Sequence, residues 1–533
     1  MSKEKVVAIG IDALPPELFE KWCDEGVLPT MNKLRDSGVY GKVKKSDQHP
    51  HDGSWLSLYR GKWPQESGEW GHTIFDTNSY EYKENPHYKV TGNELFFSDF
   101  KEIRTILFDT PLLSVDASLI NVIQIQGWGI EENQYQPVSN PQSYLQIILN
   151  KYGKHPLFGD ELVREVNSYN GEETYSMRIP SIYDYESLQR VADLAVKGLH
   201  VRANIIVDLI QNEQWDLFIT TFGELHYALH LFWHLSFTHP LFESMGNNDI
   251  DKLMLKVAKA TDEALEFVLN AVPKESELLL FSVSGMRAGY TEINNHLILP
   301  EFLYRLQFGQ AALAQGDINE PLSTPNTHYR RHWKDEVWDL RTLHGEKVLE
   351  SPFEQEKNKD PMDWSPSNWY RRLWPTMKAF ALPNYSHGMI RVNVKGREKL
   401  GIVDPAEYEE YISILASSLE KLSDSRTGKS LVKKIIQTRI NPLVSDITLP
   451  EADLIVIWDD EVVCDSAQSD EIGRIGVAPY FRTGGHHPEG FYLLKGACSS
   501  SLKEDVSVID LSSIILELLK GGTQQYMNNR LCN

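Results

Sequence analysis

Two kinds of hydrophobic pattern alternate along this chain. Short apolar runs rich in β-branched residues are typical of buried strands, and longer segments with an apolar residue every three or four positions are typical of helices. A succession of strands and helices favours an α/β fold with a doubly wound, mostly parallel sheet. Strands are predicted at 6–11, 105–108, 122–125, 217–222 and 278–284, and helices at 18–22, 185–210, 249–272 and 508–519.

Residues 310–370 depart from this alternation. They are polar, rich in Trp, Pro and Arg, and show little periodicity. A long stretch of this kind is usually functional or flexible. We therefore predict an α/β core formed by residues 1–309 and 376–533, with an insertion or cap at 310–375 that contributes to the pocket. A chain of 533 residues is longer than a single core usually serves, which agrees with this division.

Composition and charge narrow the classes of partner. The chain is 41% hydrophobic and 24% charged, as soluble globular proteins are, and its formal net charge is −22. Nucleic acids and anionic membranes bind basic surfaces, so neither is expected as a partner. A small anionic substrate is still compatible with this charge, because a bound metal ion reverses the local field.

Cysteine usage and hydropathy bear on the compartment. The four cysteines are scattered and form no CxxC motif, which argues against a disulfide framework or a zinc–cysteine site. The sequence shows neither a signal-peptide pattern nor a long apolar span, so we expect a cytoplasmic protein. The sequence does not fix the oligomeric state.

The strongest chemical signal lies in residues 216–234. A predicted strand ends at Gly223, and His226 and His230 follow with a spacing of four. On a helix that starts near Glu224, the two imidazoles lie on one face, one turn apart. A histidine pair at the carboxyl end of a strand is a candidate pair of metal ligands. The alternative is that both are ordinary surface or core histidines, as in most isolated HxxxH motifs.

Three other segments carry candidate site residues. Asp12 follows the first predicted strand, where it would either face a ligand or cap the next helix. Trp128 stands between two glycines, in a turn that either lines a pocket or only reverses the chain. Near the end of the chain, Arg482, His486 and His487 accompany two glycines and a proline. We predict a tight loop there, whose histidines either reach a shared site or are exposed.

Together these segments resemble the alkaline phosphatase superfamily and, within it, the type I phosphodiesterase/nucleotide pyrophosphatase branch. The resemblance implies a sheet of the alkaline-phosphatase type and two divalent metals, commonly zinc, that clamp a phosphoryl group. In such enzymes one metal is held by an Asp, a His four residues later and a late His. The other is held by an early Asp, a Thr or Ser nucleophile and an adjacent Asp-His pair. The order and spacing of six segments carry the resemblance: residues 10–12, 26–34, 54–64, 216–233, 393–398 and 482–490.

Only part of this ligand pattern is present. By the resemblance, Asp12 matches the early Asp, His230 the His of the first site, and His486 the late His. His226 stands where the family has Asp. The nucleophile and the adjacent Asp-His pair are also replaced, by His51, Val283 and Ser284.

The first site therefore keeps three strong ligands, and we predict a single divalent ion on His226, His230 and His486. With three neutral imidazoles the ion and its ligands carry a net charge of +2, whereas the family's Asp would lower this net charge to +1. Such a site suits zinc, on which it lowers the pKa of bound water to about 7. Iron and manganese are the alternatives.

Other residues are predicted to act around this ion. His51 is predicted as base, nucleophile or further ligand, with Asp12 orienting it and Glu224 serving the same purpose. Residues near enough in sequence to replace position 51 are Ser46, His49 and Ser54. The predicted contacts to a small anionic substrate are Arg482, His487, Trp128 and Arg397.

The predicted function is that of a metal-dependent enzyme that hydrolyses, or transfers a group on, a phosphate-ester-like substrate. One alternative is a non-catalytic binding protein on the same scaffold, and another is a biosynthetic metalloenzyme with non-phosphate chemistry. A further alternative is a two-metal phosphodiesterase that recruits ligands from elsewhere, such as Asp52 or His296.

Overall fold

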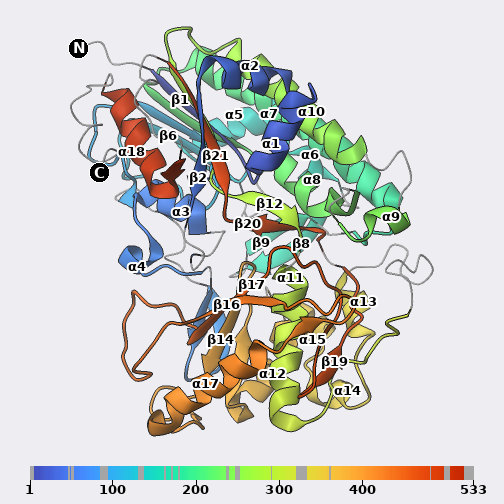
Figure 1. Cartoon of the computed structure of the whole chain (residues 1–533). Coiled ribbons are helices and arrows are strands. Elements are labelled where there is room, and N and C mark those ends of the chain that lie inside the picture. Colours follow the sequence, from blue (N-terminus) through green and yellow to red (C-terminus); the bar gives the residue numbers. More distant parts are fainter. Residues whose placement is uncertain are drawn as a thin grey trace.

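The first apolar run of the chain, Val6–Ile11, forms strand β1, and all six of its residues are buried. Burial on both faces is expected for the middle of a parallel sheet. In this computed structural model, β1 is the fifth strand of a nine-stranded sheet with the order β22-β2-β21-β11-β1-β10-β5-β6-β7 (Figure 1). The other strands are β2 Val39–Lys44, β5 Thr105–Phe108, β6 Val122–Gln126, β7 Val138–Asn140, β10 Leu217–Phe222, β11 Glu277–Ser282, β21 Gly490–Lys495 and β22 Asp505–Ser507.

The central strands of this large sheet run parallel, as predicted. Strand β1 pairs in parallel with β10 and with β11, and β10, β5 and β6 continue in the same direction. Strands β21 and β7 run the opposite way. The carboxyl ends of the five central strands thus meet at one edge, where α/β proteins bind ligands. The structure describes residues 5–45, 49, 53–71, 73–84, 90, 94–129, 137–160, 164–169, 172–177, 180–235, 239–245, 252–289, 291–319, 333–358, 360, 362–480, 482–496 and 505–520.

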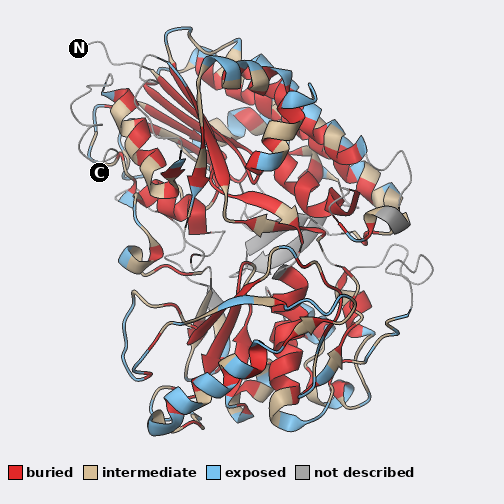
Figure 2. Cartoon of the chain, in the orientation of Figure 1, coloured by how far each residue is buried: buried red, intermediate tan, exposed pale blue. Residues whose placement is uncertain are grey.

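Helices cover both faces of the large sheet, which confirms the doubly wound fold (Figure 2). The side chains of β1 alternate between the two layers: Val7, Ile9 and Ile11 face one set of helices, and Val6 and Ala8 face the other. The first set is α1 Pro16–Asp24, α2 Pro29–Ser37, α5 Gln142–Tyr152, α7 Tyr185–Asn212, α8 Glu224–Phe232 and α10 Lys252–Leu269. The second set is α3 Gly53–Arg60 and α18 Val508–Leu519.

A second lobe has its own hydrophobic core, drawn below the large sheet in Figure 1. This core surrounds a four-stranded antiparallel sheet with the order β13-β14-β17-β16. The main elements of the lobe are β13 Ala379–Leu382, β14 Gly388–Val392, β16 Val432–Gln437, β17 Leu454–Trp458, α12 Leu299–Phe308 and α17 Tyr408–Leu419.

The segment 310–375, predicted as an insertion or cap, shares this second core. Trp333 and Trp369 belong to the same hydrophobic cluster as the four-stranded sheet, and that cluster includes residues on both sides of the segment, such as Ile293 and Tyr480. Packing therefore does not change at positions 309 and 375, and the division drawn there stays a prediction. The segment's helices are too short to show helical periodicity in the sequence: α13 Trp333–Trp338, α14 Gly345–Val348, α15 Pro352–Lys357 and α16 Pro366–Trp369.

Small elements connect and flank the two lobes. Strands β12 and β20 form a two-stranded ribbon that lies between the lobes (Figure 1). The strands are β3 Thr73–Asp76, β4 Glu81–Glu84, β8 Arg164–Tyr169, β9 Glu172–Met177, β12 Gly285–Ala288, β15 Ser423–Asp424, β18 Ala467–Ser469, β19 Gly473–Ile475 and β20 Gly484–His487. The helices are α4 Pro64–Ser67, α6 Pro156–Gly159, α9 Phe242–Met245, α11 Thr291–Ile293, the π-helix Asn294–Ile298 and 3-10 turns at Trp233–Leu235, Arg371–Thr376 and Pro405–Glu407. In the described part of the chain, no helix is long and apolar enough to cross a membrane.

Candidate metal centre

Helix α8 places His226 and His230 side by side. It begins at Glu224, directly after β10 and Gly223, as the spacing of the sequence predicts. The two rings lie one helical turn apart on the same face, with centroids separated by 4.6 Å. Both residues are buried, so neither is an ordinary surface histidine.

Strand β20 brings His486 to this pair. The segment was predicted as a tight loop, but it forms a strand that pairs with β12, His486 opposite Met286. Gly484 explains how the strand reaches the helix: a Cβ at this position would lie 2.0 Å from the carbonyl oxygen of Leu229 in α8. Only a residue without a side chain allows β20 to lie this close. The His486 ring centroid is consequently 4.9 Å from those of His226 and His230.

The three histidines are arranged as a ligand set. One nitrogen of each ring lies within 4.8 Å of the corresponding nitrogens of the other two. The Nε2 atoms of His226 and His486 are 3.2 Å apart. Nitrogens that bind a tetrahedral zinc at about 2.0–2.1 Å are separated by about 3.3–3.4 Å, close to the observed distance. Without an ion, the same two nitrogens can share a proton.

The opposite sides of two rings are held by polar contacts. The Nδ1 atom of His226 lies 3.0 Å from Oδ2 of Asp12, and Nδ1 of His230 donates to the carbonyl oxygen of Gly484 at 2.7 Å. Each ring is thereby held with Nε2 toward the other histidines, as ligating histidines usually are. Nε2 of His230 is buried and has no hydrogen-bond partner among the described residues. A buried lone pair without a partner fits a metal ion.

Electrostatics keep these imidazoles in the form that binds metal. Burial holds the pKa of His230 well below its usual value, and nearby Arg482 and the other two imidazoles lower it further. Burial also holds the pKa of His486 well below its usual value, with further lowering by His226, Arg482 and Lys45. A neutral imidazole keeps a lone pair for a metal, so the site is prepared for a cation.

Comparison with known proteins decides the family. The profile of the type I phosphodiesterase/nucleotide pyrophosphatase family matches residues 6–461. The chain belongs to this family. Enzymes of the family depend on divalent metal ions, typically zinc. No curated protein matches the chain.

Several solved structures are similar in fold to this phosphodiesterase-family chain. Phosphonoacetate hydrolase from Sinorhizobium meliloti 1021 is 12% identical with a TM-score of 0.44, and the match covers 97% of this chain and 96% of the hydrolase. Human ectonucleotide pyrophosphatase/phosphodiesterase 5 is 10% identical with a TM-score of 0.43, covering 97% and 95%. Alkaline phosphatase PafA is 10% identical with a TM-score of 0.47, covering 98% and 97%. At this level of similarity the matches carry no information about the chemistry of the site.

Position 51 and its neighbours were predicted to supply the base or nucleophile. His51 lies outside the described residues, and so do Ser46 and Asp52. Of the possible replacements, His49 stacks on Trp63 with centroids 4.5 Å apart, and burial lowers its pKa to about 4. The hydroxyl of Ser54 accepts a hydrogen bond from Nζ of Lys45 at 3.2 Å.

The carboxylate of Asp12 lies at the metal centre, in a position the sequence did not predict. It was expected to orient His51, which lies outside the described residues, and the structure places it beside His226. Its second oxygen accepts a hydrogen bond from Nε1 of Trp55 at 3.1 Å. The pairing of β1 with β10 explains the contact, because Ile11 lies opposite Phe222 and the residues that follow the two strands are neighbours.

Glu224 and Trp128 belong to a buried network behind α8. Glu224 accepts hydrogen bonds from Nε of Arg202 at 2.7 Å and from His155 at 3.1 Å. Asp109 accepts from Arg202 and from the backbone N–H of Trp128, whose indole is 1% exposed. Both predicted residues are thus engaged in this network, and an indole this buried has no surface to offer a substrate.

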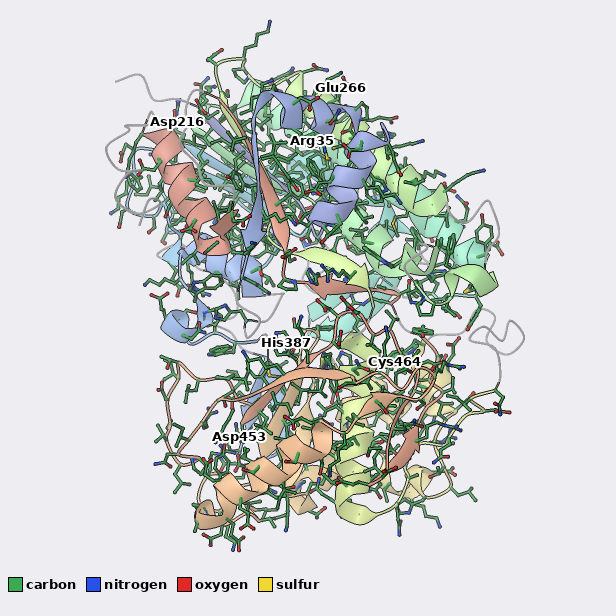
Figure 3. The ribbon with its side chains drawn as sticks, viewed as in Figure 1. Arg35, Asp216, Glu266, His387, Asp453 and Cys464 are labelled. Carbon is green, nitrogen blue, oxygen red and sulfur yellow. The ribbon has the colours of Figure 1, made fainter. Side chains whose placement is uncertain are left out.

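Two other predicted substrate contacts are engaged away from the histidines. Arg397 pairs with Asp453, to which both terminal nitrogens donate at 2.7 Å, inside the second lobe (Figure 3). His487 points from β20 toward Asp460, with Nε2 3.2 Å from the carboxylate. His296, the possible recruited ligand, hydrogen-bonds Ser365. These three side chains support the second lobe and its junction.

Arg482 is the predicted substrate contact that lies near the metal centre. Its guanidinium donates to Glu292 at 2.5 and 3.1 Å and lowers the pKa of both His230 and His486 through its charge. Lys45 also lowers the pKa of His486 and stood outside the sequence prediction. Two cations thus accompany the three histidines.

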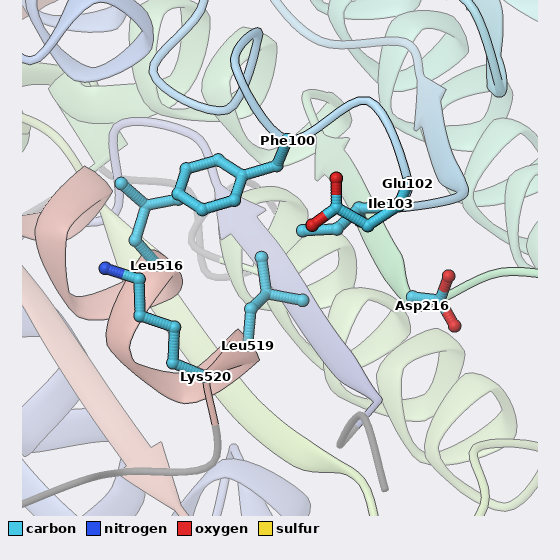
Figure 4. Close-up of a pocket in the computed structure, with 7 residues that line it drawn as sticks. All are labelled: Phe100, Glu102, Ile103, Asp216, Leu516, Leu519 and Lys520. Carbon is cyan, nitrogen blue, oxygen red and sulfur yellow. The ribbon is translucent and has the colours of Figure 1, made fainter. Parts of the chain in front are cut away.

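A pocket elsewhere on the molecule is not part of this centre (Figure 4). It lies beside Asp216, immediately before the first residue of β10, and therefore at the amino ends of the central strands. The histidines lie at the carboxyl ends. The pocket is lined by Phe100, Glu102, Ile103, Asp216, Leu516, Leu519 and Lys520.

Proposed function

We propose that this phosphodiesterase-family protein is a hydrolase of small phosphate esters that uses one divalent ion, zinc, on His226, His230 and His486. The observation that carries the proposal is the buried Nε2 of His230, which has no hydrogen-bond partner among the described residues, beside two more imidazole nitrogens. An ion bound there would polarise a phosphoryl oxygen and lower the pKa of a bound water to about 7.

The protein's own residues prepare this chemistry. Asp12 and the carbonyl of Gly484 hold two of the rings in the ligating orientation. Arg482, fixed by Glu292, and Lys45 make the surroundings of the histidines positive. A chain with a formal charge of −22 therefore presents an attractive site to an anionic substrate.

The second metal site of the family is proposed to be lost. Val283, at the position of the family's Asp, offers no ligand atom and is buried, and the hydroxyl of Ser282 donates to the carbonyl oxygen of Ser284. A hydroxyl nucleophile is also absent from position 51, where His51 stays a predicted base, nucleophile or ligand. Attack by a water activated at the single site agrees best with these replacements.

Elemental analysis joined to an activity assay tests the proposal. We expect one zinc per chain in the purified protein, and hydrolysis of p-nitrophenyl phosphate or its bis ester. His230→Ala should abolish both, and His200→Ala, which changes an exposed histidine of α7, should leave both intact. Two ions per chain would support the two-metal alternative, and a protein that takes up no metal would support the non-catalytic alternative. Cytoplasmic location stays a prediction.

A further inference from the structure

The carboxylate of Asp12 is held on both of its oxygens. Oδ2 lies 3.0 Å from Nδ1 of His226, and Oδ1 accepts a hydrogen bond from the indole N–H of Trp55 at 3.1 Å. Both Asp12 and Trp55 are 3% exposed, so water does not compete for these contacts. With a partner on each oxygen, the plane of the carboxylate is fixed, and so is the His226 ring that it faces.

Trp55 itself has little freedom to move. It lies in the first turn of α3, stacks on Tyr59 with centroids 5.9 Å apart, and packs against Phe281 at 5.7 Å. Its ring also covers the backbone of β1 at Gly10, where a Cβ would lie 2.7 Å from Cη2 of the indole. The missing side chain at position 10 therefore makes room for the tryptophan, two residues before Asp12.

We propose that Trp55 is a positioning residue of the metal centre. Its indole N–H fixes the rotamer of Asp12, and Asp12 fixes His226 with Nε2 toward His230 and His486. The inference rests on the proposed function, because it assigns a purpose to Trp55 only if the three histidines bind an ion. Loss of the indole donor would leave a buried carboxylate oxygen without this partner, which favours a rotated Asp12.

The test compares zinc affinity and ligand geometry in matched variants. Trp55→Phe keeps an aromatic ring and removes the N–H. Trp215→Phe is the control, because Trp215 is equally buried, packs on Phe218, and donates its N–H to the carbonyl oxygen of Ile210 at 3.1 Å, at the other end of β10. Zinc affinity is measured by competition with a chromophoric chelator, and geometry by the visible absorption bands of the cobalt-loaded protein.

We expect Trp55→Phe to weaken zinc binding about tenfold, the lower end of the 10–100-fold range for residues that support metal ligands. Asp12→Asn should weaken it at least as much, and Trp215→Phe should not change it. The cobalt bands of Trp55→Phe should shift or lose intensity, which a loss of stability alone would not cause. If Trp55→Phe does not fold, Trp55 is replaced by benzothienylalanine, which keeps the ring shape and carries sulfur in place of N–H.

The outcomes separate this inference from the proposed function. If the wild-type protein takes up no metal ion, or if His230→Ala does not change the uptake, the proposed function and the inference are both overturned. If the wild-type protein binds zinc, and the Trp55 variants match Trp215→Phe in affinity and cobalt spectrum, the inference alone is overturned.

Discussion

Arg202 is the buried cation on which the start of α8 depends, and replacing it by Met should destabilise the protein strongly. Its guanidinium donates to Glu224 and Asp109 at 2.7 Å each, and to the carbonyl oxygens of Thr221 and Gly129 at 3.0 Å each. Both carboxylate side chains are 0% exposed. The nearby Arg202 charge also lowers the pKa of Glu224, against the effect of burial.

The size of the effect follows from the charges left behind. Arg202→Met keeps most of the side-chain volume but leaves two carboxylates in the interior without their cation. Breaking a buried ion pair in this way costs about 3–5 kcal/mol. An unfolding entropy of about 2.1 cal/mol/K per residue amounts to about 1.1 kcal/mol/K for the whole chain, so a single unfolding transition should move down by about 3–5 °C.

Calorimetry with and without added zinc measures this shift. The control is Arg190→Met, which removes an arginine of α7 that is 49% exposed and pairs with Asp160, and should cost at most about 1 kcal/mol. Because Glu224 is the first residue of the helix that carries His226, Arg202→Met should also weaken zinc binding. If the two variants melt at the same temperature, Arg202 does not hold this region in the way proposed.

Three further predictions concern the site and its surroundings. Gly484→Ala should push β20 away from α8 and weaken zinc binding by chelator competition, whereas Gly159→Ala, with open space at its Cβ, should not. Arg482→Gln should raise KM for p-nitrophenyl phosphate about tenfold with little change in kcat, because a hydrogen bond to a charged group contributes about 1.5–3 kcal/mol. Burial lowers the pKa of His234 and His239 to about 3, so they stay neutral in the folded protein while an unfolded histidine binds a proton near pH 6.5. The free energy of unfolding from urea titrations should therefore fall as pH drops from about 6.5 toward 3, by up to about 1.4 kcal/mol per pH unit for each of the two.

Each of these predictions has a result that would contradict it. An unchanged zinc affinity in Gly484→Ala would show that the close approach of β20 is not required. A drop in kcat at constant KM would remove Arg482 from substrate binding. His239→Asn keeps an acceptor for the N–H of Leu241. If the free energy of unfolding of this variant depends on pH as steeply as that of the wild type, His239 does not titrate as described.

The parts of the fold that depend on local pattern could be predicted from the sequence. The buried strands Val6–Ile11 and Leu217–Phe222 and the helix from Glu224 appear where apolar runs and helical spacing place them. His226 and His230 share a face because four residues make about one helical turn. The family resemblance added His486, which no local pattern connects to the other two.

Tertiary contacts account for what the sequence did not predict. The contact of Asp12 with His226 depends on the register of two strands more than 200 residues apart in the chain, which no local pattern encodes. Arg397 was predicted as a substrate contact, but the structure pairs it with Asp453 inside the second lobe, which no local pattern indicates. The helices of segment 310–375 are too short for periodicity to reveal that several of their side chains are buried, and its assignment as an insertion stays a prediction.

The separation of the histidines along the chain has a consequence for synthesis. His226 and His486 are 260 residues apart, so a ribosome adding about 5–20 residues per second needs roughly 13 to 50 s between them. During that interval the nascent chain contains two of the three proposed ligands, the His226–His230 pair on α8. If the three histidines bind an ion as proposed, complete ligation has to wait until β20 has emerged and docked, and metal loading then belongs to the last stage of folding.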